Sequence, residues 1–295
     1  MAKGLVLCNL KGGLGNQMFQ YASARGCFSE EYIVFDHIFL NKYNKSSETF
    51  TARKFELDIF KNLRTKKINY LLLTLITSKN FSMRLLRKIL SVNVRIIADS
   101  DKCDQVSISG NEHKFKYIEG YFQSEEYFKH IRQELLEEFR FPELPQAAGS
   151  LLHQITASNN SVAIHVRRGD YLKSANLNYH GVLDIDYYIN SIQLLEKKMS
   201  NLNYFVFSDD ISWCQTNLLS LSPKITIIST GQDAWVDMCL MSRCSCQIIA
   251  NSSFSWWAAW LNQSDQKIII APKNWFVNPP DPIFSNLIPD NWITI

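Results

Sequence analysis

The sequence lacks the features that mark membrane-spanning, fibrous and disordered proteins. None of its apolar runs approaches the roughly 18 to 20 residues that a spanning helix requires. At the N-terminus one lysine precedes a short apolar run, too short for a secretory signal. There is no internal repeat and no low-complexity tract, and the composition is that of a globular protein. We therefore expect a folded protein in the cytoplasm.

The sequence also lacks a strong net charge, which is only +3. This value argues against a nucleic-acid partner that binds a broad basic surface. The basic residues are uneven, however: residues 61–98 contain nine of them and no acidic residue, interleaved with the apolar runs 71–76 and 85–89. Helices with a basic and an apolar face could make a peripheral contact with the cytoplasmic face of the inner membrane. The alternative is a helical pair packed within its own domain.

Nothing in the sequence resembles a compact metal site or a disulfide framework. The seven cysteines are an odd number, which favours free thiols. Cys239, Cys244 and Cys246 are close together, but two of them fall in an apolar helical pattern, which favours buried structural cysteines over zinc ligands. Two Asp-x-Asp pairs occur, Asp99/Asp101 in a polar loop and Asp184/Asp186 at a helix start. Helix capping explains the second pair, and we expect no metal.

The 295 residues are enough for two domains, and the proline-containing segment around residues 142–145 is the best boundary. We predict an N-terminal α/β domain over 1–145 and a C-terminal domain over 146–295. In the first domain we expect strands at 5–10, 32–36 and 117–122, a helix from about residue 16, and a helix from Ser124 to about Phe139.

The second half alternates regularly between strand and helix patterns. We expect strands at 161–166, 204–208, 225–229, 246–250 and 267–271, with helices at 184–199, 211–219, 232–244 and 253–263. Such alternation, with β-branched strand centres, predicts a doubly wound parallel sheet covered on both faces. The chain is then α/β with two Rossmann-like domains that face each other across a cleft.

The segment SVAIHVRRGDY, residues 161–171, is the most informative. It is an apolar strand that ends in charged residues, at the edge where open α/β sheets bind ligands. Strand alternation places His165 and Arg167 on one face and Arg168 on the other. Because a guanidinium group contacts two phosphate oxygens at once, Arg167 is the best candidate for a phosphate ligand. The alternative is an edge strand with a solvated arginine pair.

Other polar residues are predicted to meet at the same edge. Ser208, Asp209 and Asp210 follow the second strand of this half. Ser252 and Ser253 follow the fourth strand and open a helix, whose free N–H groups favour an anion. Ser253 could instead only cap that helix, which would not exclude phosphate binding.

Two further candidates lie outside that edge. Asp237 is a lone carboxylate in an apolar helical segment and requires a hydrogen-bond donor. In the first half, Gly12, Gly13 and Gly15 follow a strand and allow the backbone to turn tightly beside a ligand. Their spacing matches neither GxGxxG nor GxxxxGK[ST], so glycine spacing alone says little.

Four segments together resemble bacterial α-1,2-fucosyltransferases, a family related to the α-1,6- and protein O-fucosyltransferases. The segments are GGLGNQMFQYA (12–22), HVRRGDY (165–171), FSDD (207–210) and DMCLMSRCSCQIIANSSFSWWAAWL (237–261). They occur in the family's order over nearly the whole chain. The resemblance implies a GT-B architecture, GDP-fucose as donor, a galactoside acceptor, inversion at the anomeric carbon and no required metal.

The resemblance also implies roles for individual residues. Arg167 would contact the β-phosphate, with His165 and Arg168 beside the nucleotide. Asp237 would bind guanine, Ser253 the pyrophosphate, and Asn16 would lie near the fucose. From their positions at the helix start and in the glycine turn, Ser252, Gly13 and Gly15 are added to the expected donor-binding residues. Where the α-1,6 enzymes carry a glutamate base, this sequence has Ala175, so the base is unassigned. Asp170 is a candidate, and the competing account is a loose transition state with late proton loss.

Two alternative functions remain at this point. A fucosyltransferase with another acceptor or linkage would carry the same donor motifs. A non-catalytic carbohydrate-binding module is suggested by the five tryptophans Trp256, Trp257, Trp260, Trp275 and Trp292. The helical spacing of Trp257 and Trp260 favours core positions instead.

Overall fold

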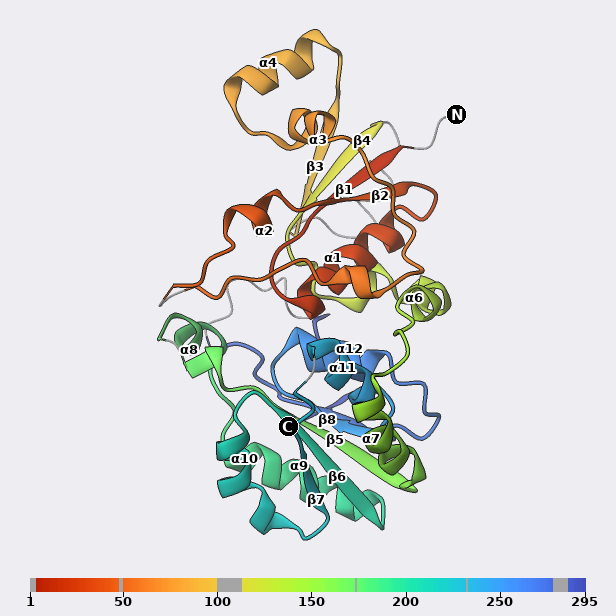
Figure 1. Cartoon of the computed structure of the whole chain (residues 1–295), viewed down its shortest axis with the longest axis vertical. Helices are drawn as coiled ribbons and strands as arrows, with labels where there is room; N and C mark the ends of the chain where they lie inside the picture. Colours follow the sequence, from red (N-terminus) through yellow and green to blue (C-terminus); the bar gives the residue numbers. More distant parts are fainter. Residues whose placement is uncertain (1–3, 48–49, 100–112, 173, 232, 278–285) are drawn as a thin grey trace. The chain divides into compact units, whose positions relative to one another are not determined.

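A computed structural model describes residues 4–47, 50–99, 113–172, 174–231, 233–277 and 286–295. The chain forms two compact units (Figure 1). The N-terminal unit contains Met1–Lys45, Ala52–Arg140 and Ile283–Leu287, and the C-terminal unit contains Ser46–Thr51, Phe141–Pro282 and Ile288–Ile295. The main division falls between Arg140 and Phe141, five residues before the end of the first predicted domain.

The N-terminal unit is built on a parallel sheet with strand order β2-β1-β4-β3. Its strands are β1 (Leu5–Asn9), β2 (Tyr32–Asp36), β3 (Val94–Ala98) and β4 (Phe115–Glu119). All three pairings are parallel, so each connection crosses from one end of the sheet to the other. Sequence analysis predicted β1, β2 and β4 but missed β3, because it lies in the basic segment that was interpreted as helical.

Helices connect these strands. After β1 comes α1 (Leu14–Cys27), and after β2 come α2 (Ile38–Lys42), α3 (Tyr70–Thr77) and α4 (Phe81–Ile89). Helix α3 packs on the sheet, where Leu73 and Ile76 join a buried cluster with Leu7, Val34 and Tyr117. The segment therefore contains two helices, as predicted, but of these two α3 alone packs within the unit, because no residue of α4 is buried.

The helix predicted from Ser124 to Phe139 is wrong in its first half. Two short 3-10 turns, Glu125–Tyr127 and Lys129–Ile131, precede α6 (Arg132–Glu138). Phe128 has a non-helical backbone with φ −146° and is fully buried. A Cβ on Gly26 of α1 would lie 2.0 Å from the Tyr127 carbonyl oxygen, so this segment runs directly against α1. Tertiary packing thus overrides the helical pattern, whereas Ser124 does cap the first turn.

The C-terminal unit has a six-stranded sheet with order β10-β9-β8-β5-β6-β7. Its strands are β5 (Asn160–Val166), β6 (Leu202–Ser208), β7 (Ile225–Ile228), β8 (Cys246–Ile248), β9 (Ile269–Ala271) and β10 (Ile293–Thr294). All pairings are parallel. The chain moves outward from β5 to β7, returns to β8 and continues to β10, which is the Rossmann strand order.

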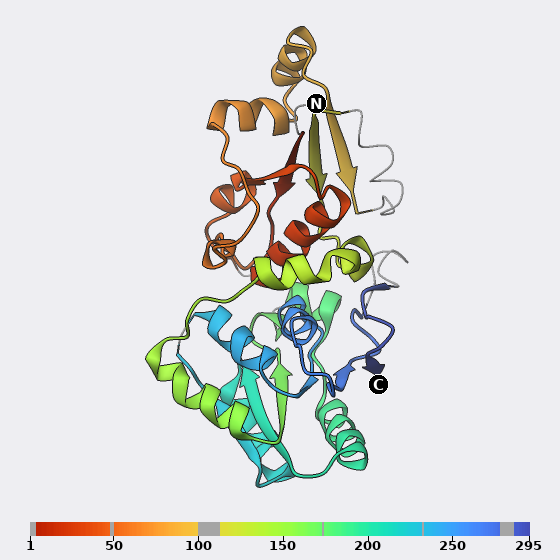
Figure 2. The ribbon, with the colours of Figure 1, turned by 90° about the vertical axis from the view of Figure 1, so that its right-hand side faces the viewer.

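Helices cover both faces of this sheet, as predicted. They are α7 (Gln146–Ala157), α8 (Ser174–His180), α9 (Ile185–Lys198), α10 (Ile211–Asn217), α11 (Ala234–Ser242) and α12 (Ser253–Trp260). Figure 2 shows α7 and α9 on opposite sides of the strands. Side chains of α9 pack on β5, β6 and β8 in one buried cluster. Sequence analysis did not predict α7, α8 or β10.

The tryptophans fill the C-terminal core. Trp256, Trp257 and Trp260 are at most 2% exposed, and Trp275 and Trp292 are 8% exposed. No exposed aromatic platform is thus formed by these five residues, and the prediction that Trp257 and Trp260 are core residues is confirmed. Within the described residues, no helix has the length and apolar character needed to cross a membrane.

Candidate functional site

The strand order places one topological switch point in the C-terminal sheet, between β5 and β8. These neighbouring strands belong to the two halves of the sheet, and their outgoing connections run to opposite sides. In open α/β sheets a ligand binds beyond the carboxyl ends of the strands at this point. Residues that follow Val166 and Ile248 therefore define the candidate site.

Arg167 immediately follows β5 and lies between two carboxylates. Its Nη2 donates to Asp170 Oδ1 at 2.5 Å, and its Nη1 lies 2.8 Å from Asp209 Oδ2. The guanidinium also lies over the ring of Tyr171, 5.5 Å from its centroid. The side chain remains 22% exposed. Arg167 is thus held in a fixed orientation without being enclosed.

Arg168 points to the neighbouring strand end. Its Nε donates to Asp210 Oδ2 at 3.1 Å, and its guanidinium lies 4.5 Å from the centroid of the Trp213 ring. Asp210 also caps α10 by accepting from the Trp213 backbone N–H. The side chain of Arg168 therefore has a different carboxylate partner from the side chain of Arg167.

Asp209 joins the ends of β5 and β6. Its Oδ1 accepts from the backbone N–H of Arg168 at 2.9 Å, while Oδ2 faces Arg167. Burial by itself would raise the pKa of Asp209, but the charge of Arg167 and the N–H groups of Arg168 and Gly169 outweigh it and lower the pKa. The carboxylate therefore stays ionised and keeps Arg167 oriented.

His165, on β5, is 5% exposed, and its ring lies 5.5 Å from that of Phe254 on α12. Burial, with a smaller effect from the charge of Arg167, lowers its pKa to about 3, so the ring is neutral at pH 7. Within the described residues, His165 Nδ1 has no hydrogen-bond partner. A buried polar atom left in this state favours a partner outside the chain.

A second group of polar atoms lies beside the end of β8. Asn251 is buried, and its side-chain Nδ2 donates to the backbone carbonyl of His180 at 2.7 Å. The backbone carbonyl of Asn251 accepts from the Tyr171 hydroxyl at 3.1 Å. The rings of Tyr171 and His180 are stacked, with centroids 4.6 Å apart. Among the described residues, Asn251 Oδ1 and His180 Nδ1 lack a partner.

Sequence analysis did not identify His180. Burial lowers its pKa to about 4, with Arg167 acting in the same direction and Asp170 against it. The only sequence signal was a histidine between an aromatic residue and a glycine in a polar connection. That pattern does not reveal stacking on Tyr171, nine residues earlier.

Helix α12 begins at the same edge of the sheet. Ser252 is its N-cap and accepts from the Phe254 backbone N–H at 3.4 Å. Ser253 is the first helical residue and is partly exposed. Helix α12 is apolar and almost entirely buried, so its N-terminal N–H groups are held rigidly. Free N–H groups and the helix dipole at this end favour an anion.

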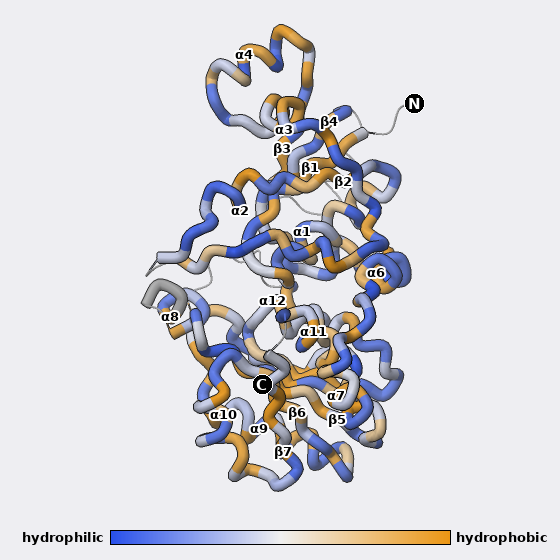
Figure 3. Tube along the Cα trace, viewed as in Figure 1, coloured by the Kyte–Doolittle hydropathy of each residue, from blue (hydrophilic) through white to orange (hydrophobic). Residues whose placement is uncertain are grey.

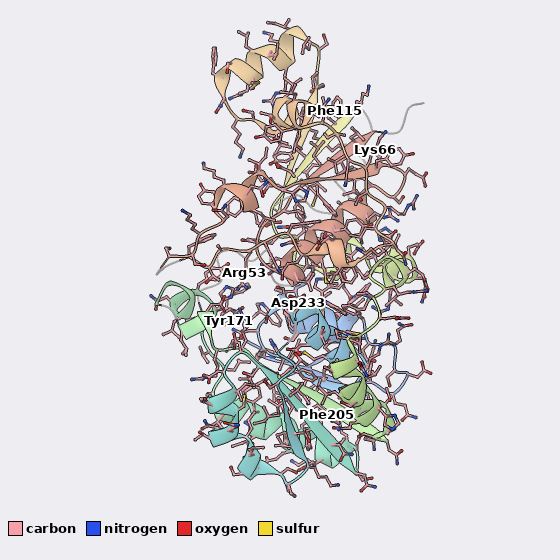
Figure 4. The ribbon with its side chains drawn as sticks, in the orientation of Figure 1. Arg53, Lys66, Phe115, Tyr171, Phe205 and Asp233 are labelled. Carbon is pink, nitrogen blue, oxygen red and sulfur yellow. The ribbon has the colours of Figure 1, made fainter. Side chains whose placement is uncertain are left out.

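Asp237 is partly buried on α11. Its Oδ1 accepts from the Thr230 hydroxyl at 2.8 Å. Burial raises the pKa of Asp237, and the hydrogen bond from Thr230 opposes this effect. Helices α11 and α12 pack together. Asp233, labelled in Figure 4, is the N-cap of the same helix and is exposed.

The remaining candidates belong to the N-terminal unit. Gly12 has φ +76°, and a Cβ there would lie 2.3 Å from the side-chain nitrogen of Asn16, so only glycine fits. Gly13 is the N-cap of α1 and Gly15 is buried in its first turn. Asn16 Oδ1 accepts from Gln123 Nε2 at 2.8 Å. Arg53, labelled in Figure 4, is close to Gly13: a Cβ added to Gly13 would lie 3.8 Å from Arg53 Cδ.

Within the C-terminal unit, the structure brings together His165, Arg167, Arg168 and Asp170, with Phe254 of α12 against His165. Gly13, Gly15 and Asn16 form a separate group at the start of α1. Asp184 caps α9 as predicted, whereas Asp101 lies outside the described residues. Cys239, Cys244 and Cys246 are buried. Among the described residues, no three metal-ligating side chains form a cluster.

The known proteins that this chain resembles in sequence are glycosyltransferases. The chain matches glycosyl transferase family 11 over residues 2–295. It is 35% identical to an α-1,2-colitosyltransferase of Escherichia coli, over 99% of both chains. It is 31% identical to the O-antigen biosynthesis glycosyltransferase WbnK of Escherichia coli, over 97% of this chain and 99% of WbnK. Human galactoside α-(1,2)-fucosyltransferase 1 is 29% identical over 51% of this chain and 44% of that protein.

Solved structures share the fold at low identity. A variant of Arabidopsis thaliana FUT1 in complex with GDP gives a TM-score of 0.52 at 13% identity, covering 95% of this chain and 73% of that chain. The α-1,6-fucosyltransferase NodZ, co-crystallised with GDP, gives 0.50 at 13% identity, covering 88% and 92%. The predicted α/β, GT-B-like fold with parallel sheets is confirmed. Because the family matches almost the whole chain, this protein is a glycosyltransferase that belongs to glycosyl transferase family 11.

Proposed function

We propose that the protein transfers L-fucose from GDP-β-L-fucose to the 2-hydroxyl of a galactoside, with inversion and without a metal, in the synthesis of a surface polysaccharide or glycolipid. The family match and the names of its relatives support a glycosyltransferase with an α-1,2 linkage. The observation that carries the proposal is the arginine network at the β5–β8 switch point.

Departure of GDP leaves negative charge on the β-phosphate, and the site must supply hydrogen-bond donors or positive charge that stabilise it. Arg167 has five N–H donors and uses two nitrogens for Asp170 and Asp209. Among the described residues its other N–H groups make no ion pair, so they can donate to phosphate oxygens, while the two carboxylates fix the plane of the guanidinium group. The N-terminus of α12 at Ser252 and Ser253 adds N–H groups and a favourable dipole. Such fixed dipoles can take the place of a metal.

The unpartnered atoms at this edge fit a polar ligand. His165 Nδ1 and Asn251 Oδ1 are buried and lack partners among the described residues. Because His165 is neutral at pH 7, Nδ1 can accept from a ribose hydroxyl or donate to a phosphate oxygen, depending on its tautomer. A nucleoside diphosphate supplies both kinds of group.

Asp237 would select the base. Guanine presents N1–H and its 2-amino group side by side, so one carboxylate accepts both, whereas adenine has no such pair. A partly buried carboxylate with a raised pKa gains most from two external donors. Thr230 already donates to Oδ1 and would keep the carboxylate oriented toward the base.

The reaction also needs a base that deprotonates the acceptor hydroxyl. A positioned base contributes about 10² to 10⁴ in rate. Asp170 is our candidate, and its Oδ1 already accepts from Arg167 at 2.5 Å. This contact gives Asp170 a structural task in addition to any catalytic one. A loose, oxocarbenium-like transition state with late proton loss is the alternative.

A specific observation favours a second donor. The relative at 35% identity is named an α-1,2-colitosyltransferase. Colitose is fucose without its 3-hydroxyl, so the two GDP-sugars differ by one hydrogen-bonding group. A site that hydrogen-bonds this hydroxyl would reject GDP-colitose, because its own polar group would be left unpaired.

The test is a transfer assay with GDP-fucose or GDP-colitose, lactose and a galactoside panel, with and without EDTA. We expect an α-1,2-fucosylated product that EDTA does not suppress. Transfer of colitose alone would reassign the donor, and a product of different linkage would reassign the acceptor position. If no sugar is transferred while calorimetry shows no GDP binding, the proposal is wrong.

A further inference from the structure

The surface of α3 and α4 carries a feature that the glycosyltransferase site does not use. We define the α4 surface as the exposed apolar side chains of this region. It comprises Tyr70, Leu71, Phe81, Leu85, Leu86, Ile89 and Leu90. We propose that this surface docks the protein on a bilayer that contains anionic lipids, with α4 lying in the plane of the headgroups. This proposal does not depend on the proposed function.

Helix α4 is amphipathic, but its apolar face is exposed, whereas the apolar face of an ordinary domain helix is buried. Phe81, Leu85 and Ile89 are four residues apart and so lie on one face. An apolar face of this kind normally packs against the core. Here Phe81 is 82%, Leu85 49% and Ile89 70% exposed, and no residue of α4 is buried. In Figure 3, α4 alternates between hydrophobic and hydrophilic segments.

Helix α3 anchors α4 to the unit and adds to the same surface. Leu73 and Ile76 of α3 pack on the sheet, whereas Leu71 is 80% and Tyr70 67% exposed. Arg87 of α4 donates to the carbonyl oxygens of Leu75 and Ile76 at the end of α3. The apolar face is therefore presented by a fixed pair of helices rather than by a loose segment.

Basic side chains lie beside this apolar face. Lys79, Arg84, Arg87 and Lys88 line a hollow of about 580 Å³ between α3, α4 and β3. Arg84 and Lys88 are exposed, while Lys79 pairs with Glu119 at 2.8 Å. No acidic residue occurs between residues 61 and 98. The hollow therefore presents positive charge to an anion of headgroup size.

An anionic bilayer fits both features at once. Acyl chains would cover Phe81 and Ile89, and anionic headgroups would meet Arg84 and Lys88. A nucleic acid would satisfy the charges but not the aliphatic side chains. A second copy of this chain would oppose two surfaces of the same charge. With nine residues, α4 is far too short to cross a bilayer, so it would lie on the surface.

The α4 surface and the glycine turn lie at opposite edges of the N-terminal sheet. Four residues separate the end of α4 at Ile89 from the start of β3 at Val94, which places α4 at the amino edge. Gly12 and Gly13 follow the carboxyl end of β1. Because all strands are parallel, these are different edges. Changes in the α4 surface should therefore leave sugar transfer to a soluble acceptor intact.

The experiment is co-sedimentation of the full chain with vesicles of phosphatidylethanolamine and phosphatidylglycerol, compared with pure phosphatidylcholine. We expect binding only to the anionic vesicles, reduced at 0.5 M NaCl by screening. Arg84→Gln/Lys88→Gln should lower the affinity roughly 30-fold, since each basic residue contributes about fivefold. Phe81→Ser should lower it by about tenfold or more.

Two matched controls should bind like the unmodified chain. Lys197→Gln/Lys198→Gln removes the same charge from the exposed end of α9, and Leu219→Ser removes an exposed leucine of the C-terminal unit. An independent measurement needs no variant: amide exchange of residues 81–90 should slow when anionic vesicles are added.

Three outcomes would overturn the proposal. The first is equal binding to both vesicle types, or binding that survives both α4 variants. The second is a vesicle-free dimer that Phe81→Ser dissociates, which would assign the surface to a second copy. The third is RNA binding that Arg84→Gln/Lys88→Gln abolishes while anionic vesicles bind nothing.

Discussion

Two arginine–carboxylate networks, one in each unit, show how the same chemistry serves different ends. In the N-terminal unit, Arg25 of α1 contacts Glu138 of α6 at 2.9 Å, and their side chains are 2% and 7% exposed. In the C-terminal unit, Arg167 contacts Asp170 and Asp209, and these three side chains are 15–26% exposed. The first network is closed, and the second is open to a ligand.

The closed network also leaves little hydrogen-bonding capacity unused. Arg25 donates to both oxygens of Glu138 and to the Ser29 carbonyl, and Tyr21 donates to Glu138 at 2.6 Å. Burial alone would lower the pKa of Arg25, but Glu138 raises it. The open network instead adjoins unpartnered atoms such as His165 Nδ1. The structural ion pair is therefore distinguished from the candidate binding site by its deeper burial and by the larger share of its hydrogen-bonding groups that have partners.

The largest expected effect is on the closed network. Arg25→Met leaves the buried Glu138 without its cation and should reduce the free energy of unfolding by about 3–5 kcal/mol. Urea denaturation measures this change. Arg25→Met/Glu138→Leu should recover part of it, because an apolar replacement of both partners removes the unpaired charge. A loss below about 1 kcal/mol in the single variant would show that the pair is not structural.

Arg167→Ala should weaken GDP binding strongly and change the stability of the fold only slightly. We expect GDP affinity to fall by about 1.5–3 kcal/mol, roughly 10- to 150-fold, since a charged hydrogen-bond donor is lost. The free energy of unfolding should change by about 1 kcal/mol or less, because the pair is partly exposed. Calorimetry with GDP and urea denaturation measure the two quantities. Normal GDP affinity in Arg167→Ala would reject the site.

Asp237→Asn tests base selection. An amide cannot accept from both guanine donors as the carboxylate does, so the preference for GDP over ADP should fall by about 1–3 kcal/mol. Asp233→Asn is the matched control, because it removes the same charge from an exposed position on the same helix. Competition of both nucleotides for the binding site measures the preference. An equal loss of affinity for both would mean that Asp237 does not select the base.

The effect that is smallest near neutral pH is the pH dependence of stability that comes from His165. The pKa of His165 is lowered to about 3, so below its unfolded value near 6.5 the unfolded chain binds a proton that the folded chain does not. Stability should therefore fall by about 1.4 kcal/mol per pH unit from this group as pH drops below 6.5. His165→Gln should remove that part of the slope, whereas His153→Gln, at an exposed position, should not. Unchanged slopes in both variants would contradict the assignment.

Local patterns predicted much of the C-terminal unit. Most predicted strands there overlap the observed ones, because buried parallel strands are continuous apolar runs. The prediction that polar residues after the strands meet at one edge is confirmed for Arg167 and Asp209. Prediction from local patterns failed in the N-terminal unit, where contacts with distant residues set the conformation of a segment. The segment around Phe128 departs from a helical pattern because it packs against Gly26.

The sequence by itself determined the order of the elements, the α/β class and the family, because apolar periodicity and short motifs are local properties. Only the tertiary structure decided which residues became partners. It placed Glu138 on Arg25, Asp209 on Arg167 and His180 on Tyr171, and it left the apolar face of α4 exposed. The physical reason is that ion pairing, stacking and burial depend on distances between chain segments, and those distances exist only once the sheets have formed.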